Sequence, residues 1–260
     1  MVSNILPAQD WKAAGHSGDW LTSELFQILP WIYVALLALL IVQALVTRRR
    51  YRAVDVLTTA DQERVRVAIR EIEDATSGDI VPLVVERSDP QTHTWLLAGA
   101  SLGLLGNLML LGWLPQQGFL ALGAAEVALF TLCLGVAALC PDLRRWFLTR
   151  RRADATAGEQ ALIEMGRLAQ VKQSPPLVLL FVSLFEHRVI VLANAAAAGT
   201  VAPESWPKAV EAVLEGVRRG RLADGLAAGV QACAAEMKVA FPHAGPRDNS
   251  FADRAITRRE

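Results

Sequence analysis

Three long apolar segments constrain the fold of this 260-residue chain more than any other feature of its sequence. Residues 25–47 contain no Asp, Glu, Lys or Arg, and residues 94–140 contain a single one, Glu126. A Leu-Pro-Gln-Gln-Gly break divides the second stretch in two. At about 1.5 Å per helical residue, each segment can cross a hydrocarbon core about 30 Å thick. The sequence therefore predicts a transmembrane helix over residues 25–47 and a transmembrane helical hairpin over residues 94–140, because buried helices of a soluble core rarely stay uncharged for so long.

Arginines directly follow the first and the third predicted crossing. They are Arg48, Arg49, Arg50 and Arg52 after the first, and Arg144, Arg145, Arg150, Arg151 and Arg152 after the third. Residues 1–24 carry only Lys12, and the predicted hairpin tip carries neither Lys nor Arg. Because short loops rich in these residues stay in the cytoplasm, we predict that residues 1–24 are extracytoplasmic and that the main domain is cytoplasmic. The N-terminal residues lack the pattern of a cleaved signal peptide, so we expect the first crossing to remain as an anchor.

The composition narrows the class of protein further. The chain is 53% hydrophobic and 20% charged with zero formal net charge, which is too apolar for a disordered chain. Arginines beside a membrane segment set topology and touch anionic headgroups, so we expect the lipid bilayer as a partner and no nucleic acid. Three cysteines without a Cys-x-x-Cys pair predict neither a disulfide framework nor a zinc site. Cys140 is either a palmitoylation site or a small buried hydrophobe.

Residues 48–93 form the first of two pieces outside the predicted crossings. Apolar residues at helical spacing predict a helix whose N-cap is Thr59 and which stops before Gly78. The β-branched, nearly continuous apolar run over residues 79–86 predicts a strand buried on both faces. Pro82 lacks a ladder donor, so this strand lies at a sheet edge or is bulged at that residue.

The second piece, residues 141–242, supplies the remaining elements. They are a helix over residues 153–170, a β-hairpin of residues 177–184 and 188–193, and two amphipathic helices beginning near Trp206 and Leu222. Neither piece can cover its own apolar surface. We therefore predict an α/β membrane protein, in which a small sheet with packed helices is interrupted by the transmembrane hairpin and preceded by the N-terminal transmembrane helix. Residues 243–260 are polar and aperiodic, and we expect a disordered tail.

Several strings within these elements carry a family resemblance. They are residues 57–65 and 71–81, residues 177–191, and residues 219–230. They resemble the opening helix and first strand, the central hairpin and the last helix of the TPM-domain family, whose members include thylakoid-lumen acid phosphatases, photosystem repair factors and many bacterial membrane proteins. The resemblance implies a TPM-like domain in two parts, residues 48–93 and 141–242. It also implies a multi-pass protein of the bacterial cytoplasmic (inner) membrane.

One segment departs from the family pattern. After the second hairpin strand the family commonly carries a glycine-rich turn with acidic residues, where oxygen ligands can hold a divalent cation. Residues 194–200 of this chain contain no carboxylate, and Asn194 offers one amide carbonyl. The four histidines show no ligand spacing, and no phosphate-binding loop, nucleophile elbow or dinucleotide fingerprint occurs. We predict no catalytic, cofactor-binding or metal-binding residues and no cofactor.

Two carboxylates leave one alternative open. Asp79 and Glu86 flank the first predicted strand, where they either build a site at the end of the strand or are simply solvated.

Polar and small residues inside the hairpin are the candidate partner-binding residues. Glu126 is costly in hydrocarbon, so it either pairs with another protein or lies neutral or snorkelling near the interface. Gly99, Gly103 and Gly106 permit close helix approach, either by another protein or by the third crossing of the same hairpin.

Two function classes follow from these observations. The first is a non-catalytic membrane adaptor that binds another integral membrane protein or membrane complex and assists its assembly or quality control; a homo-oligomer is also compatible with the sequence. The second is a membrane-tethered phosphatase, which the family resemblance implies. Phosphate release from a generic ester distinguishes the two.

Overall fold

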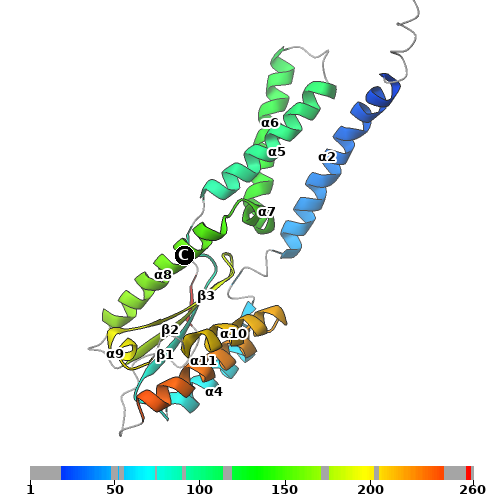
Figure 1. Ribbon diagram of the computed structural model, residues 1–260. Coiled ribbons are helices and arrows are strands. Elements are labelled where there is room, and N and C mark those ends of the chain that lie inside the picture. The colour runs from blue at the N-terminus through cyan, green and yellow to red at the C-terminus, as the bar shows by residue number, and fades with distance from the viewer. Residues whose placement is uncertain are drawn as a thin grey trace, which may run out of the picture. The chain divides into compact units, whose positions relative to one another are not determined.

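The structure is a computed structural model. It describes residues 19–47, 52, 56–73, 75–89, 92–113, 119–170, 176–201, 205–242 and 256–258. The chain divides into two compact units, each assembled from two stretches of sequence (Figure 1). Unit 1 comprises Met1–Val46 and Thr92–Arg144, and unit 2 comprises Thr47–Gln91 and Arg145–Glu260.

Unit 1 is built from apolar helices. They are α2 (Asp19–Thr47), α5 (Thr92–Trp113) and α6 (Phe119–Leu139), followed by the short α7 (Pro141–Trp146), which runs into unit 2. The stretches Gln27–Thr47, His93–Leu111 and Leu120–Leu139 are each long and apolar enough to cross a membrane. The three apolar helices predicted from the sequence are thereby confirmed, and they indicate a multi-pass membrane protein. Residues 114–118, the predicted hairpin tip, lie outside the described residues.

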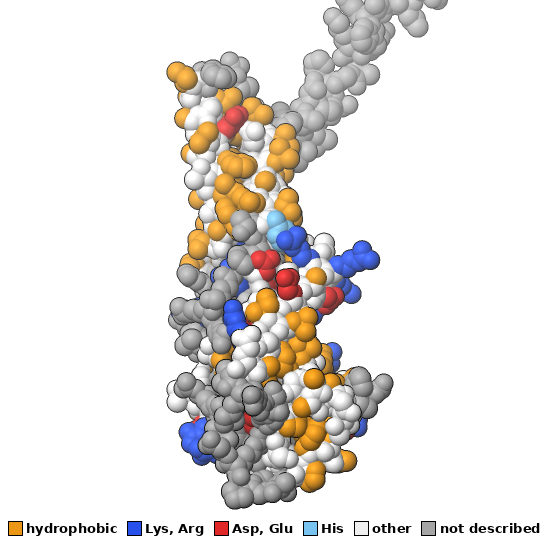
Figure 2. Space-filling view, turned by 90° about the vertical axis from the view of Figure 1, so that its left-hand side faces the viewer, with side chains coloured by type: hydrophobic (Ala, Val, Ile, Leu, Met, Phe, Trp, Pro, Cys, Tyr) orange, Lys and Arg blue, Asp and Glu red, His pale blue; other side chains and the backbone are white. Residues whose placement is uncertain are grey.

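The helices of unit 1 expose large apolar side chains. Trp31 is 65% exposed, Leu104 is 63% exposed and Leu120 is 85% exposed. Figure 2 shows hydrophobic side chains gathered over these helices with few charges among them. A contiguous apolar surface of this kind is unfavourable in water and suits contact with lipid.

Unit 2 contains a four-stranded mixed sheet of order β3-β2-β1-β4. Its strands are β1 (Asp79–Val85), β2 (Leu177–Ser183), β3 (Arg188–Ala193) and β4 (Ile256–Arg258). Strand β1 pairs in parallel with β2 and β4, and β2 pairs antiparallel with β3. The predicted first strand and β-hairpin are confirmed. Because β1 precedes α5 in the sequence and β2 follows α6, residues on both sides of the apolar hairpin form one sheet.

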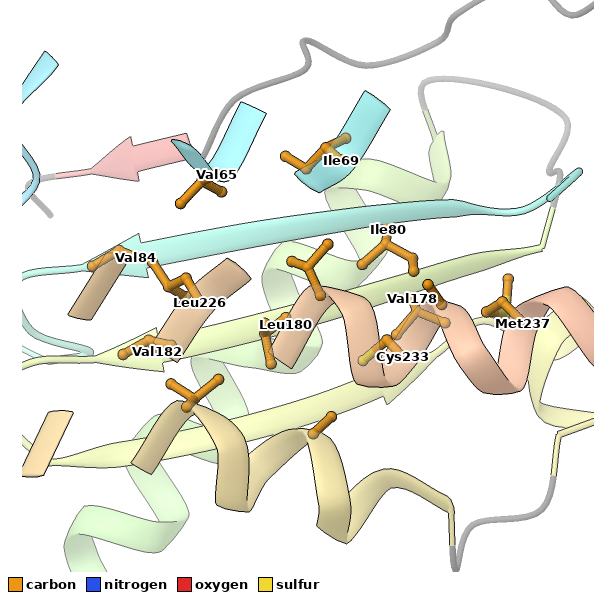
Figure 3. Packing of buried hydrophobic residues seen from close by; sticks show 14 of the residues in the cluster. Val65, Ile69, Ile80, Val84, Val178, Leu180, Val182, Leu226, Cys233 and Met237 are labelled. Atoms are coloured by element: carbon orange, nitrogen blue, oxygen red, sulfur yellow. The ribbon is translucent and has the colours of Figure 1, made fainter. Parts of the chain in front are cut away.

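Helices cover both faces of this sheet (Figure 1). Helix α8 (Arg150–Gln170) lies on one face, and α4 (Thr59–Glu73), α10 (Trp206–Arg218) and α11 (Leu222–Ala240) lie on the other. Side chains of β1 alternate between the two cores, with Val84 packed among residues of α4 and α11 and Leu83 packed against the α8 side. Figure 3 shows the first of these cores, in which Leu180 and Leu226 are fully buried.

Pro82 lies in an inner strand and still removes no hydrogen bond of the ladder between β1 and β2. The amide of Asp79 donates to the Pro176 carbonyl at 2.7 Å, so alternate residues of β1, including Leu83, direct their backbone groups toward β2. The backbone of Pro82 faces the opposite side. Strand β4 begins its pairing one residue later, at Leu83 with Ile256. The prediction of an edge position is therefore wrong, because β1 lies between β2 and β4; the strand accommodates Pro82 because the backbone of this residue does not face β2.

The N-cap of α4 is shifted by one residue from the prediction. The Thr58 hydroxyl, not that of Thr59, accepts from the Asp61 amide at 3.3 Å. The Asp61 carboxylate accepts in return from the Thr58 amide at 3.1 Å and from the Thr58 hydroxyl at 2.7 Å. This reciprocal pair is a capping box with Asp in the place of Glu, which selects Thr58 over its neighbour.

The prediction of a disordered tail is wrong for three residues. Ile256–Arg258 form β4 and pair with Leu83–Val85. Ile256 packs against the core on the α8 side, and this contact explains why so short a strand pairs with β1. A three-residue strand is too short to produce a detectable alternation in the sequence. The rest of the tail beyond residue 242 lies outside the described residues.

Helices α10 and α11 approach each other through glycine. A Cβ on Gly216 would lie 2.3 Å from the Gly225 Cα, and a Cβ on Gly225 would lie 2.8 Å from the Val213 carbonyl oxygen. Gly220, with φ of 71°, ends α10 in a Schellman motif, in which the Arg221 amide donates to the Gly216 carbonyl. The backbones therefore touch where side chains would otherwise separate them.

Candidate functional site

The three glycines predicted as partner contacts face helices of the same unit. A Cβ on Gly99 would lie 2.6 Å from a Leu134 side-chain carbon and 2.9 Å from the Leu134 Cα. A Cβ on Gly103 would lie 2.4 Å from the Phe130 ring. These residues therefore let α5 and α6 pack closely against each other. Of the two alternatives, the structure shows close approach by the third crossing of the same hairpin. Contact of these glycines with another protein stays a prediction.

Gly106 makes room for a side chain of α2. A Cβ at this position would lie 2.7 Å from the Tyr33 hydroxyl oxygen. That hydroxyl donates to the Leu102 carbonyl oxygen at 2.8 Å and lies 3.0 Å from the Cys133 sulfur. Tyr33 is 7% exposed, so its polar end is buried and hydrogen-bonded. This tyrosine joins α2 to both helices of the hairpin.

Glu126 belongs to the same packed stripe of α6. Phe130 and Leu134 follow it at intervals of four residues, so all three side chains lie on one helix face. Leu134 meets Gly99 and Phe130 meets Gly103. Continuing this register by four residues along each helix leads to Asn107 on α5 and Glu126 on α6, which we call the polar layer.

Neither member of this polar layer is satisfied within the described part of the chain. The Asn107 Oδ1 atom is buried and has no hydrogen-bond partner there. Glu126 is partly exposed and makes no hydrogen bond or ion pair with a described residue. Asn107 was not predicted as a site residue. The signal that reveals it is the antiparallel register, which becomes visible only once the glycine contacts are known.

A second polar cluster lies at the carboxyl ends of β1 and β2. Glu186 accepts hydrogen bonds from the Ser183 hydroxyl and from the Ser88 amide, the latter at 3.1 Å. The Ser88 hydroxyl donates to the Ser183 hydroxyl at 3.0 Å. Ser183 and Glu186 are 1% and 2% exposed. These hydrogen bonds connect the segment that follows β1 to the turn between β2 and β3. The sequence analysis did not predict this cluster.

Asp79 and Glu86 are not brought together. They lie at opposite ends of β1, which at about 3.3 Å per residue separates them by roughly 20 Å. Asp79 is 2% exposed and Glu86 is half-buried, so the reading of both as freely solvated carboxylates is wrong. No shared site is formed by this pair.

Asn194 has a structural role in the segment that departs from the family pattern. Its side-chain oxygen accepts from the Leu177 amide at 3.1 Å and from the Ala197 amide at 3.0 Å. It thereby caps the short helix α9 (Ala195–Ala198) and fixes the start of β2. Among the described residues, no three His, Cys, Asp or Glu side chains are grouped so that they could hold a metal ion.

The cysteines are buried and free. Cys133 and Cys140 belong to unit 1 and Cys233 to unit 2, and each is 0% exposed. Burial raises the pKa of the Cys233 thiol to about 12, so it stays protonated at neutral pH. Cys140 is buried, which agrees with the prediction of a small buried hydrophobe rather than with that of a palmitoylation site.

The fold and these contacts define a multi-pass membrane protein with a small mixed α/β unit. No protein-family model and no curated protein matches the sequence. Among solved structures, the chain is similar to the NMR structure of the BA42 protein from the psychrophilic bacterium Bizionia argentinensis, with 12% identity and a TM-score of 0.48 over 77% of this chain and 94% of that chain. The TPM-domain resemblance stays a prediction.

Proposed function

We propose that this protein is a non-catalytic membrane adaptor, which binds another integral membrane protein and assists its assembly or quality control. In this proposal the helices of unit 1 contact the partner within the membrane, and unit 2 is a TPM-like domain in the cytoplasm of a bacterial cell. The observation that carries the proposal is Glu126, an ionisable side chain in an apolar helix that makes no hydrogen bond or ion pair with a described residue.

The energetics of the membrane interior support a role for this residue in binding. A charged or unsatisfied carboxyl group is costly in hydrocarbon. Helical spacing puts Glu126 on the face of α6 that carries Phe130 and Leu134, and Glu126 is partly exposed. A partner helix that offers a hydroxyl, amide or basic donor at the polar layer would satisfy both of its residues. Association between membrane helices depends on such polar contacts and on close packing, because lipid offers no hydrophobic gain.

Co-purification from mild detergent tests the proposal. Each interhelical hydrogen bond contributes about 0.5 to 2 kcal/mol, so Glu126→Leu should weaken retention of the partner about 2- to 30-fold without abolishing it. Thr131→Leu is the matched control, because the Thr131 hydroxyl already donates to the Val127 carbonyl of its own helix. Equal loss in both variants, unchanged retention in Glu126→Leu, or a wild-type protein that migrates alone contradicts the proposal.

The orientation within this proposal has its own test. The native cysteines are buried, so an introduced cysteine can be labelled against a low background. Asp61→Cys should be protected from an impermeant thiol reagent added outside the cell, and Gln116→Cys, at the predicted tip, should react. The reverse pattern would place unit 2 outside.

The alternative function has a separate test. Phosphate release by the purified protein, measured with and without divalent cations, would favour the membrane-tethered phosphatase instead.

A further inference from the structure

Two groups of arginines in unit 2 differ in their side-chain contacts. Those of the first group lie within 4 Å of a carboxylate oxygen: Arg64, Arg66, Arg167, Arg188, Arg218, Arg219 and Arg221. Those of the second group, Arg145, Arg150, Arg151 and Arg152, make no side-chain hydrogen bond or ion pair with any described residue. The nearest following acid, Asp154, is already paired with Arg188. Positive charge is therefore concentrated without compensation over residues 145–152.

An exposed tryptophan lies in the same segment. Trp146 is 86% exposed, directly beside Arg145 in the sequence and four residues before Arg150. Tryptophan is usually well buried, and exposure of this extent calls for an explanation. Its ring is apolar with one polar N–H, which favours the level of the headgroups at a membrane surface.

The chain itself brings this segment to a membrane surface. The apolar stretch of α6 ends at Leu139, and Trp146 follows seven residues later. Seven residues span at most about 25 Å when fully extended and about 10 Å when helical. Trp146 therefore cannot lie far from the point at which the chain leaves the hydrocarbon.

We propose that Trp146 and the four unpaired arginines form a binding surface for the headgroups of anionic phospholipids. The guanidinium groups bind phosphate oxygens, for which their planar donor geometry is suited, and the indole lies among the headgroups. Charge complementarity selects anionic over zwitterionic lipid. This surface does not depend on Glu126 or on a protein partner, so it can hold whether or not the adaptor proposal does.

Native mass spectrometry of the full chain in mild detergent tests the lipid preference. The protein is offered equal amounts of a phosphatidylglycerol and a phosphatidylcholine with the same acyl chains. Each arginine near an anionic surface strengthens binding about fivefold, so replacing all four by Gln should reduce the preference for phosphatidylglycerol by at least about tenfold. The matched control replaces four paired arginines, Arg66, Arg218, Arg219 and Arg221, by Gln and should keep the preference.

Further arms separate the lipid from other anions. Replacing the four unpaired arginines by Lys should keep most of the preference, because the charge is retained. Trp146→Ala should weaken binding of both lipids and leave their ratio unchanged. Equal binding of the two lipids by wild type, equal loss in the control variant, or a Trp146→Ala protein that binds both lipids as wild type does overturns the proposal. Displacement of the phosphatidylglycerol by equimolar inorganic phosphate or a short single-stranded oligonucleotide overturns it as well.

Discussion

Both units bring helices together through glycine, but what surrounds the glycines differs. In unit 1, Gly103 faces the ring of Phe130, which can rotate, whereas in unit 2 Gly216 and Gly225 face each other's backbone. The α10–α11 contact also lies over a continuous apolar core, which resists displacement of either helix. The hairpin of unit 1 has lipid-facing side chains around it that can adjust. We therefore expect added volume to be tolerated less well in unit 2.

The buried cysteines allow each unit to be followed separately. Cys133 and Cys140 become reactive when unit 1 opens, and Cys233 becomes reactive when unit 2 opens. Peptide mapping after thiol labelling at increasing denaturant therefore yields two unfolding curves from one protein. The native-state pKa of Cys233 near 12 keeps its background reaction low at neutral pH.

The largest effect is expected from Gly225→Ala. The new methyl group would meet the Val213 carbonyl oxygen and the Gly216 Cα, neither of which can move without moving α10. We expect the free energy of unfolding of unit 2 to fall by about 1 to 3 kcal/mol. Gly166→Ala in α8 is the control, since nothing lies within 4 Å of its Cβ position, and it should stabilise unit 2 by about 0.5 to 1 kcal/mol. A Gly225→Ala protein as stable as wild type would remove the proposed difference between the units.

A smaller effect is expected from Gly99→Ala in unit 1. Its Cβ would lie 2.6 Å from a movable Leu134 methyl group but also 2.9 Å from the Leu134 Cα. We expect Cys133 to become reactive at a denaturant concentration corresponding to a loss of about 1 kcal/mol. Gly135→Ala, with open space at its Cβ position, is the matched control in α6. Labelling of Cys233 should be unchanged in both variants, and a shift there would mean that the units unfold together.

These two glycine contacts also show what a sequence can predict. The spacing of Gly99 and Gly103 within an uncharged stretch predicts a close helix contact, and the three apolar helices, β1 and the β2–β3 hairpin follow from apolar patterns alone. Gly225 and Gly229 in α11 have the same four-residue spacing, so the sequence carried a signal for the glycine face of this helix that the sequence analysis did not use. Gly216 of α10 has no such neighbour within its helix, so the sequence does not show that Gly216 and Gly225 meet. The antiparallel register that relates Asn107 to Glu126 and the Ser88–Ser183–Glu186 cluster both involve residues far apart in sequence. They depend on helix register and strand order, which no short stretch of residues encodes.

Tyr33→Phe tests whether one buried hydrogen bond matters to the packing of unit 1. The substitution keeps the ring against Gly106 and leaves the Leu102 carbonyl without the hydroxyl that donates to it. A typical intramolecular hydrogen bond contributes about 0.5 to 1.5 kcal/mol, so Cys133 should be labelled at slightly lower denaturant. The control is Tyr51→Phe, because Tyr51 lies outside both the three apolar helices and the described residues. Equal labelling curves for Tyr33→Phe and wild type would show that packing alone holds α2 to the hairpin.

The smallest expected effect is a pH dependence confined to unit 2. The hydrogen bond from the Thr58 hydroxyl lowers the pKa of Asp61, and burial opposes this while the Thr58 amide and Arg64 add to it. A carboxyl group whose pKa is lowered by folding stabilises the native state above its unfolded pKa, near 4, and that contribution is lost as the pH falls through the folded value. Asp61 is 19% exposed and Arg64 is 58% exposed, so screening by solvent keeps the effect small.

Asp61→Asn provides the measurement of this effect. Asparagine cannot carry the charge that the cap and Arg64 stabilise, so the variant should be less stable than wild type at pH 6, and this difference should be smaller at pH 3. Denaturant unfolding of unit 2, followed by circular dichroism at both pH values, yields the two differences. Glu63→Gln is the matched control, because Glu63 pairs with Arg66 on the exposed side of the same helix and does not take part in the cap. If the difference between wild type and Asp61→Asn is the same at both pH values, the capping box stabilises α4 through its hydrogen bonds and not through the charge of Asp61.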